Sequence, residues 1–509
     1  MPITFQNPHF RGNFFWITAT FVAVFFSFCS LPTEPMDGSQ LAGAYCATCH
    51  AYPEPQLLDQ ATWKNYVLPR MGQFLGIYKN QKQRDTLLNQ DGSSSYLQEK
   101  NIYPASPLLS NDEWLAIQEF YIKNAPQQLR VAPLTTQKSN LFQARFPDIF
   151  LSPPSSTYIE LDSQTLYFSD ANKQVFVELD EQLKVKRQAM VGEGLVHVEQ
   201  EQDAFWLTLM GSFSPTDQAK GYVFKLSTQS SEPSQKVITN LQRPVHSSYS
   251  DFNADGLIDI LICEYGKWTG ALSLWLQNKD GKFSRHNLVE RSGAIATEVL
   301  DINQDGLSDF IALFGQGDES LQLFINQGNQ KFKSRRLVSL HPSMGSSSFS
   351  LFDFNGDQKL DIIYTAGDNA DYPPVIKPYH GIYVYEQKAN FVFEQTLFLP
   401  SPGAYRAIPA DFDLDGDIDI ASISFFPDYD QQAQEFVFFE NNNQQFIPKT
   451  INLQQMGRWI VMDIGDIDAD GDLDLALASL SFEAPGHPNL IDQWIKNGIP
   501  FVLLENRSR

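Results

Sequence analysis

The 509-residue sequence predicts a multidomain protein, in which a small all-α domain precedes an all-β, seven-bladed β-propeller. Three observations support this fold class. Residues 39–124 carry helical periodicity, whereas from residue 146 onward apolar and polar residues alternate as they do in strands. Five acidic runs begin at residues 251, 301, 353, 411 and 466, and this nearly constant spacing is typical of structural repeats.

The composition is that of a globular protein, with 42% hydrophobic and 19% charged residues. The formal net charge is −23 and no basic stripe offsets it, so we expect no binding to nucleic acid. A chain this acidic either keeps itself in solution or collects cations. The placement of its aspartates favours the second reading, as the acidic runs show below.

The first 29 residues resemble an export signal. Arg11 precedes an apolar run from Phe14 to Phe28, which suits a signal peptide and is short for a membrane span. Cys29 ends the run where a bacterial lipoprotein carries its lipid, although the preceding Phe-Ser-Phe departs from the usual small residues. Simple cleavage and lipidation therefore both stay open. We expect a periplasmic or cell-surface protein, with a lipid anchor on Cys29 as its only route to the membrane.

Residues 30–38 are predicted to be a linker, and residues 39–125 form the predicted helical domain. Its last helix is the clearest, because Ser110 and Glu113 have the spacing of a capping box and Pro126 ends the apolar periodicity. Residues 126–145 show little periodicity and are predicted to link this domain to the propeller, residues 146–509.

Each repeat of the predicted propeller contains an acidic run, a continuous apolar strand and a hairpin, which together make one four-stranded blade. Residues 270–283 illustrate the hairpin, with two strands around an Asp-Gly turn. We expect the apolar strand to lie near the propeller axis, buried on both faces. Residues 146–245 have the same strand rhythm without acidic runs and supply two further blades. The segment 142–150 is the candidate strand that closes the last blade.

The acidic runs follow the pattern D-x-[DN]-x-D-G-x-x-D, in which oxygens converge if the chain turns sharply at the sixth position. The sequence therefore predicts four or five structural calcium ions, with an ordinary acidic turn as the alternative. The third run is the weakest, because Gln358 replaces the glycine. The candidate ligands are Asp251, Asn253, Asp255, Asp259, Asp301, Asn303, Asp305, Asp309, Asp353, Asn355, Asp357, Asp361, Asp411, Asp413, Asp415, Asp419, Asp466, Asp468, Asp470 and Asp474.

Cys46, Cys49 and His50 form a Cys-x-x-Cys-His motif, the attachment signal for a covalent haem c. A zinc site would need two more ligands, and only Cys29 and Cys263 remain as thiols. A thioredoxin-type dithiol would need an alternating strand–helix pattern that is absent here. Met71 is the only methionine between Cys46 and residue 125, so it is the predicted distal ligand; a core methionine is the alternative.

One loop could hold a substrate. Asp368, Asn369, Asp371, Tyr379 and His380 gather acid, amide, phenol and imidazole groups in the longest interval between acidic runs. Sugar-binding sites use such mixtures, but an ordinary polar insertion is the favoured interpretation. An enzyme acting on a sugar or another small substrate, either a haem-coupled oxidoreductase or a polysaccharide-active enzyme, therefore stays the alternative to a binding platform.

The acidic loops and their hairpins resemble the FG-GAP/VCBS repeats of calcium-binding β-propellers, over residues 246–509 well and over 146–245 poorly. Together with the segment from Tyr45 to Gly72 and the helix after Ser110, the chain resembles exported monohaem proteins of a Bacteroidetes-like family, in which a cytochrome c domain is fused to an FG-GAP propeller. The resemblance implies electron transfer outside the cytoplasm. It implies a redox partner protein or a glycan ligand without identifying either.

Overall fold

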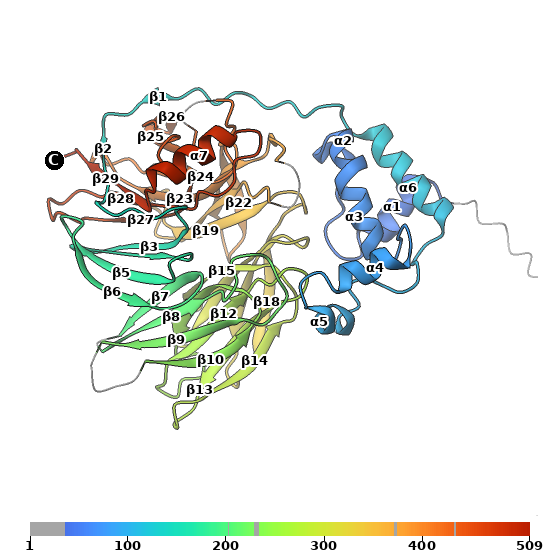
Figure 1. Ribbon diagram of the computed structural model, residues 1–509, viewed down its shortest axis with the longest axis horizontal. Helices are drawn as coiled ribbons and strands as arrows, with labels where there is room; N and C mark the ends of the chain where they lie inside the picture. The colour runs from blue at the N-terminus through green and yellow to red at the C-terminus, as the bar shows by residue number, and fades with distance from the viewer. Residues whose placement is uncertain (1–35, 202, 229–233, 371–373, 432–433) are drawn as a thin grey trace, which may run out of the picture.

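The computed structural model describes residues 36–509 except 202, 229–233, 371–373 and 432–433. Its helices α1–α6 lie beside a large β-propeller, and the chain enters the propeller through a long extended segment along one edge (Figure 1). The predicted signal segment 1–29, most of the linker 30–38 and Asp371 lie outside the described residues.

The helical section begins at Asp37, which caps the first helix, and ends before Ala125. Its last helix has the predicted capping box, in which the Ser110 hydroxyl accepts from the Glu113 backbone N–H. The helical section has its own hydrophobic cluster, which includes Trp63, Trp114 and Tyr121. The helices are α1 (Gly38–Cys46), α2 (Gln60–Thr62), α3 (Leu68–Phe74), α4 (Gln81–Leu88), α5 (Ser94–Glu99) and α6 (Asn111–Asn124), with single turns at Pro55–Leu57 and Trp63–Val67.

The propeller has seven blades, as the sequence predicts. The first two, without acidic runs, are β3 (Ser156–Asp162), β4 (Thr165–Asp170), β5 (Val175–Asp180), β6 (Val185–Met190), and β7 (Leu195–Glu201), β8 (Ala204–Leu209), β9 (Gly221–Ser227), β10 (Gln235–Leu241). Blades three and four are β11 (Pro244–Ser250), β12 (Asp259–Glu264), β13 (Ala271–Gln277), β14 (Phe283–Val289), and β15 (Ala294–Leu300), β16 (Asp309–Phe314), β17 (Ser320–Asn326), β18 (Phe332–Ser339).

The fifth blade comprises β19 (Ser346–Phe352), β20 (Asp361–Ala366), β21 (Gly381–Gln387) and β22 (Phe393–Pro400). The sixth comprises β23 (Ala404–Ala410), β24 (Asp419–Ser424), β25 (Phe436–Asn442) and β26 (Gln445–Thr450), and the seventh β27 (Trp459–Gly465), β28 (Asp474–Ser479) and β29 (Phe501–Asn506). Strands that follow one another within a blade are antiparallel, so each blade is a meander.

The seventh blade is closed by the N-terminal part of the propeller. Strand β2 (Phe142–Arg145) pairs antiparallel with β29, as predicted for segment 142–150. Two elements were not predicted. Strand β1 (Gln137–Lys138) adds a fifth strand, parallel to β26, to the sixth blade, and helix α7 (Pro488–Asn497) fills the connection between β28 and β29.

The apolar strand is buried on both faces, as predicted, and it is the second strand from the axis. The strand before each acidic run is innermost, because β11 contacts β7 and β15, its counterparts in the neighbouring blades. The apolar strand is the second one: in β12 every residue is buried, whereas β11 alternates. The second strand is covered on both faces by the neighbouring blades. The first strand has one edge on the axis, and polar side chains lie along it.

The helical section rests on one face of the propeller, which we call the upper face. It is formed by the connections from second to third strand and from blade to blade, such as 265–270 and 290–293. Lys100 makes an ion pair with Glu290 of 2.8 Å, and the Phe74 and Trp268 rings lie 5.1 Å apart between centroids. The acidic runs, between first and second strands, lie on the opposite, lower face.

Candidate functional sites

The Cys-x-x-Cys-His motif begins at the last residue of α1. Cys49 is exposed, whereas Cys46 and His50 are half-buried. The Nδ1 atom of His50 lies 2.8 Å from the carbonyl oxygen of Ala51 and donates to it when protonated. This hydrogen bond orients the ring and leaves Nε2 free to ligate a metal, as a proximal histidine requires.

The His50 ring faces the propeller. A side-chain carbon built on Gly317, in the upper-face connection between β16 and β17, would lie 3.9 Å from His50 Cδ2. The motif therefore sits at the junction of the helical section and the upper face, on the side where the two parts of the chain meet.

The surroundings of the thiols argue against an activated dithiol. Burial raises the pKa of the Cys46 thiol, whereas reactive dithiols have a lowered pKa. Cys263 is fully buried within β12, where burial raises its pKa to about 12, so it behaves as a small apolar residue. Within the described residues, clusters of three or more potential metal-ligating acids or thiols occur only in acidic loops of the lower face.

Met71 lies in α3 and packs, half-buried, against the hydrophobic cluster that also receives Cys46 and Tyr52. The motif and the predicted distal ligand thus share one apolar wall.

The five acidic loops share one backbone conformation. In each, the first aspartate accepts from the N–H of the sixth residue at 2.8–3.1 Å. The fifth aspartate accepts from the N–H of the seventh residue at 2.8–3.1 Å. In the last two loops, three carboxylates come within 4.8 Å of one another: Asp411, Asp413 and Asp419, and Asp466, Asp468 and Asp470. The first three loops have asparagine at the third position instead.

The ninth aspartate of each loop has a further role that the pattern did not reveal. Asp309 is fully buried; one carboxylate oxygen accepts from the Ile302 N–H at 3.1 Å and the other from the Asn326 N–H at 2.7 Å. The same pair of bonds recurs at Asp259, Asp361, Asp419 and Asp474. Each of these aspartates ties its loop to the end of the third strand of the same blade.

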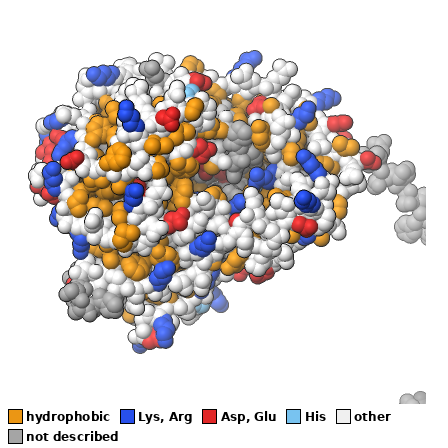
Figure 2. All heavy atoms as spheres, in the orientation of Figure 1, with side chains coloured by type: hydrophobic (Ala, Val, Ile, Leu, Met, Phe, Trp, Pro, Cys, Tyr) orange, Lys and Arg blue, Asp and Glu red, His pale blue; other side chains and the backbone are white. Residues whose placement is uncertain are grey.

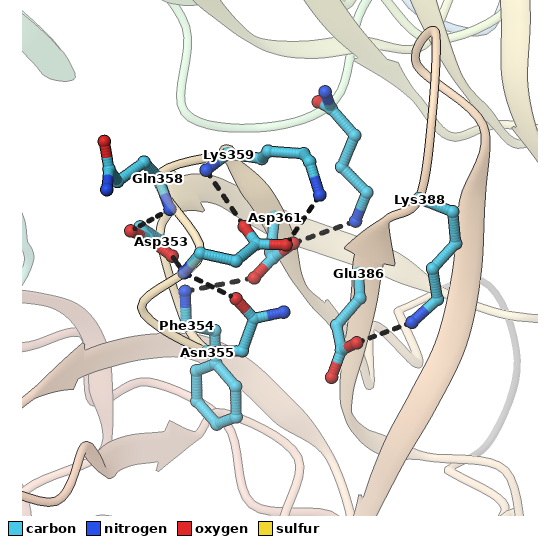
Figure 3. A network of polar contacts seen from close by, with 10 residues as sticks. Asp353, Phe354, Asn355, Gln358, Lys359, Asp361, Glu386 and Lys388 are labelled. Carbon is cyan, nitrogen blue, oxygen red and sulfur yellow. Dashed lines mark hydrogen bonds and ion pairs between the residues drawn. The ribbon is translucent and has the colours of Figure 1, made fainter.

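The third loop departs from the others in two ways (Figure 3). Gln358 takes the left-handed conformation, φ +67°, that glycine occupies in the other loops. Its N–H still donates to Asp353 at 2.8 Å, so the turn is preserved. In addition, the Lys359 ammonium donates to Asp357 at 2.7 Å and lowers the pKa of that carboxyl. A cation supplied by the chain thus competes for one predicted ligand, which sequence reasoning missed.

Part of the predicted substrate loop contacts the helical section. The Tyr379 hydroxyl donates to the carbonyl of Leu57, in the helical section, at 2.9 Å. The Asn369 amide donates to the Val375 carbonyl, and burial lowers the pKa of His380 well below its usual value. A cavity of about 340 Å³ lies beside this loop, but none of its four described candidate residues, Asp368 included, lines it.

The fold defines the protein as a seven-bladed β-propeller with an added helical section. Residues 251–312 and 301–364 match the model of the FG-GAP-like repeat, so this stretch consists of FG-GAP repeats. The match covers the first three acidic loops and their second strands. No sequence among the curated proteins matches the chain.

Three solved structures give a sense of the likeness in fold. The N-terminal domain of Nup159 has 12% sequence identity and a TM-score of 0.43, over 74% of this chain and 99% of that one. Saccharomyces cerevisiae Sqt1 has 8% identity and a TM-score of 0.43, over 74% and 100%. BBS1N, from a complex with ARL6DN soaked with mercury, has 8% identity and a TM-score of 0.42, and the likeness covers 72% of this chain and 97% of that one. At these values nothing about the function of this chain follows from them.

Proposed function

We propose that the protein is an extracytoplasmic c-type cytochrome that transfers electrons through one covalent haem, with the propeller as a calcium-stabilised binding platform. The observation that carries this proposal is the Cys46–His50 motif, in which His50 Nδ1 is held by the Ala51 carbonyl and Nε2 is left available. The FG-GAP propeller supplies the platform for a redox partner protein or a glycan.

The residues present fit the proposed group. Cys46 and Cys49 would hold it through two thioether bonds, His50 would ligate the iron through Nε2, and Met71 would be the distal ligand. The haem supplies one-electron chemistry when bound. The chain's own contribution is to orient the His50 ring and to exclude water with the apolar wall around Met71.

The arrangement supports different roles for the two propeller faces. The helical section and its motif adjoin the upper face, where blade connections vary in length. The predicted calcium loops lie on the lower face, where an ion would fix each turn that enters a second strand. A partner or glycan bound on the upper face would be next to the motif.

The proposed location rests on the sequence before residue 36. No helix of the described residues is long and apolar enough to span a bilayer. Mass spectrometry of the mature N-terminus tests export, and a diacylglycerol on Cys29 would distinguish lipidation from simple cleavage.

The haem is tested by expressing the full chain in cells that mature c-type cytochromes. We expect a covalent haem signal on a denaturing gel and a pyridine haemochrome typical of two thioether bonds. Cys46→Ser with Cys49→Ser should abolish both signals. Cys263→Ser is the matched control, because its thiol is buried inside β12 and should leave both unchanged. A wild-type chain without covalent haem under these conditions would refute the proposal.

A further inference from the structure

Two buried carboxylates on the upper face are well partnered. Glu264 is an ion-pair partner of Arg285 at 2.7 Å and accepts from the Ser273 hydroxyl. Glu319 accepts from the N–H and the hydroxyl of Ser346. This pairing is what the high cost of burying an uncompensated charge leads one to expect.

The terminal nitrogens of Arg458 lack partners of this kind in the part of the chain that the structure describes. Arg458 lies just before β27, is only 2% exposed, and its Nε donates to the Phe425 carbonyl at 2.8 Å. The guanidinium carbon stacks 3.5 Å from the centroid of the Phe425 ring. Its two terminal nitrogens, Nη1 and Nη2, have no hydrogen-bond partner among the described residues.

Other unpartnered polar atoms surround the same place between the sixth and seventh blades. They are the second carboxylate oxygen of Glu435 and the amide oxygen of Gln434. The Tyr429 hydroxyl lies close enough to Arg458 to interact with it. Burial lowers the pKa of Arg458, and the nearby carboxylates of Glu483 and Asp368 oppose that shift. Arg458 is therefore a buried cation whose terminal nitrogens make no hydrogen bond within the described residues.

We propose that Arg458 binds the carboxylate of a small ligand on the upper face, through its two terminal nitrogens, with the Tyr429 hydroxyl as a second donor. A guanidinium presents parallel N–H groups that match a carboxylate in a bidentate pair. The neighbouring Phe425 and Phe426 rings would contact the apolar part of such a ligand. This site is independent of the haem and calcium proposals.

The alternative is that Arg458 only packs the blade junction. The two readings differ in the effect of removing the charge. An unpaired buried charge destabilises the fold, so its replacement by an apolar residue of similar length should be neutral or stabilising without ligand. A packing residue would lower stability when replaced, whatever the ligand.

Thermal melting of the full-length protein tests the proposal. Sodium D-glucuronate and sodium acetate are compared with D-glucose and sodium chloride at equal ionic strength. We expect both carboxylates, but neither control, to raise the melting temperature in a saturable way. Arg458→Met should remove this rise without lowering the melting temperature in sodium chloride. Arg285→Met, which breaks a paired arginine of the same face, should lower the melting temperature and keep the rise.

Tyr429→Phe removes only a hydroxyl and provides a second test in case Arg458→Met does not fold. It should raise the half-maximal carboxylate concentration about tenfold, because a hydrogen bond to a charged group contributes about that much to binding. The proposal is overturned if the wild type does not respond to either carboxylate, or if the response survives Arg458→Met.

Discussion

Single residues decide how well each acidic loop turns. The sixth position is left-handed in all five loops, and in four of them glycine occupies it at φ between +84° and +97°. At the sixth position only Gln358 carries a side chain, and the left-handed conformation costs an L-residue about 1 kcal/mol or more. The sequence marked this run as the weakest; the structure shows the left-handed conformation, with the hydrogen bonds of the turn retained.

Gln358→Gly should therefore raise the free energy of unfolding by about 1 kcal/mol. Urea denaturation of the two proteins in the presence of a chelator measures the difference. The matched variant is Gly306→Gln, which introduces the same strain into the preceding loop and should lower stability by a similar amount. Equal stability of Gln358→Gly and wild type would contradict this account.

A buried carboxyl away from the acidic loops gives the fold a pH dependence. Burial raises the pKa of Glu435 to about 7, while the unfolded chain titrates near about 4.3. The folded state holds this proton more tightly. The contribution of Glu435 to stability is therefore complete below pH 4 and is lost as pH rises towards 7.

Glu435→Gln should flatten the fall in stability between pH 4.5 and 7, as measured by urea midpoints in chelator across that range. Exposed Glu119→Gln is the control and should keep the wild-type slope. If both variants retain the wild-type slope, Glu435 is not the group responsible.

The distal haem ligand is also a one-residue question. If Met71 ligates the iron, Met71→Ala should remove the weak sulfur-to-iron absorption band and shift the iron towards high spin. Met36, which is exposed just before α1, is the matched control and should leave the spectrum unchanged on substitution by alanine. An unchanged spectrum in Met71→Ala would show that another group, or none, holds the distal position.

At the scale of elements, the ninth aspartate makes the acidic loop part of its blade. Its two oxygens accept one N–H from the loop and one from the end of the third strand, so loop, second strand and third strand are joined at a buried point. Removing it would leave two buried donors without partners. The fifth aspartate, by contrast, is exposed and is a predicted ligand of the proposed calcium ion.

The two roles can be separated within one loop. Asp309→Ala should lower stability by about 3 kcal/mol with or without calcium, because two buried N–H groups lose their acceptor. Asp305→Ala should cost less than about 1 kcal/mol in chelator and should instead reduce the gain that calcium gives. Denaturation curves in calcium and in chelator test both; equal losses in the two variants would contradict the separation.

At the scale of the whole molecule, acidic loops and the helical section occupy opposite faces. Lys and Arg side chains are dispersed among acidic and apolar ones on the side of the molecule seen in Figure 2. Negative charge, by contrast, is clustered in the five acidic loops, which carry much of the net charge of −23. Loops of like charge repel one another unless cations occupy them.

Calcium should therefore raise the melting temperature of the whole propeller, and a chelator should lower it. The effect should shrink at pH 5, where the buried loop carboxyls take up protons: burial raises the pKa of Asp474 to about 6. Magnesium at the same concentration is the control, because it prefers a smaller octahedral site. A melt that a chelator leaves unchanged would remove calcium from the proposal.

Local patterns in the sequence were enough to predict the blade count, the closing strand, the capped helix 111–124 and the turns of the acidic loops. These follow from local period, capping and turn chemistry, which neighbouring residues specify. Contacts in the folded chain were needed to show which strand lines the axis, that the ninth aspartates are buried ties, that Lys359 competes for Asp357, and that the terminal nitrogens of Arg458 lack partners among the described residues. Those features depend on contacts between residues far apart in the chain, and burial there sets the energy of each charge.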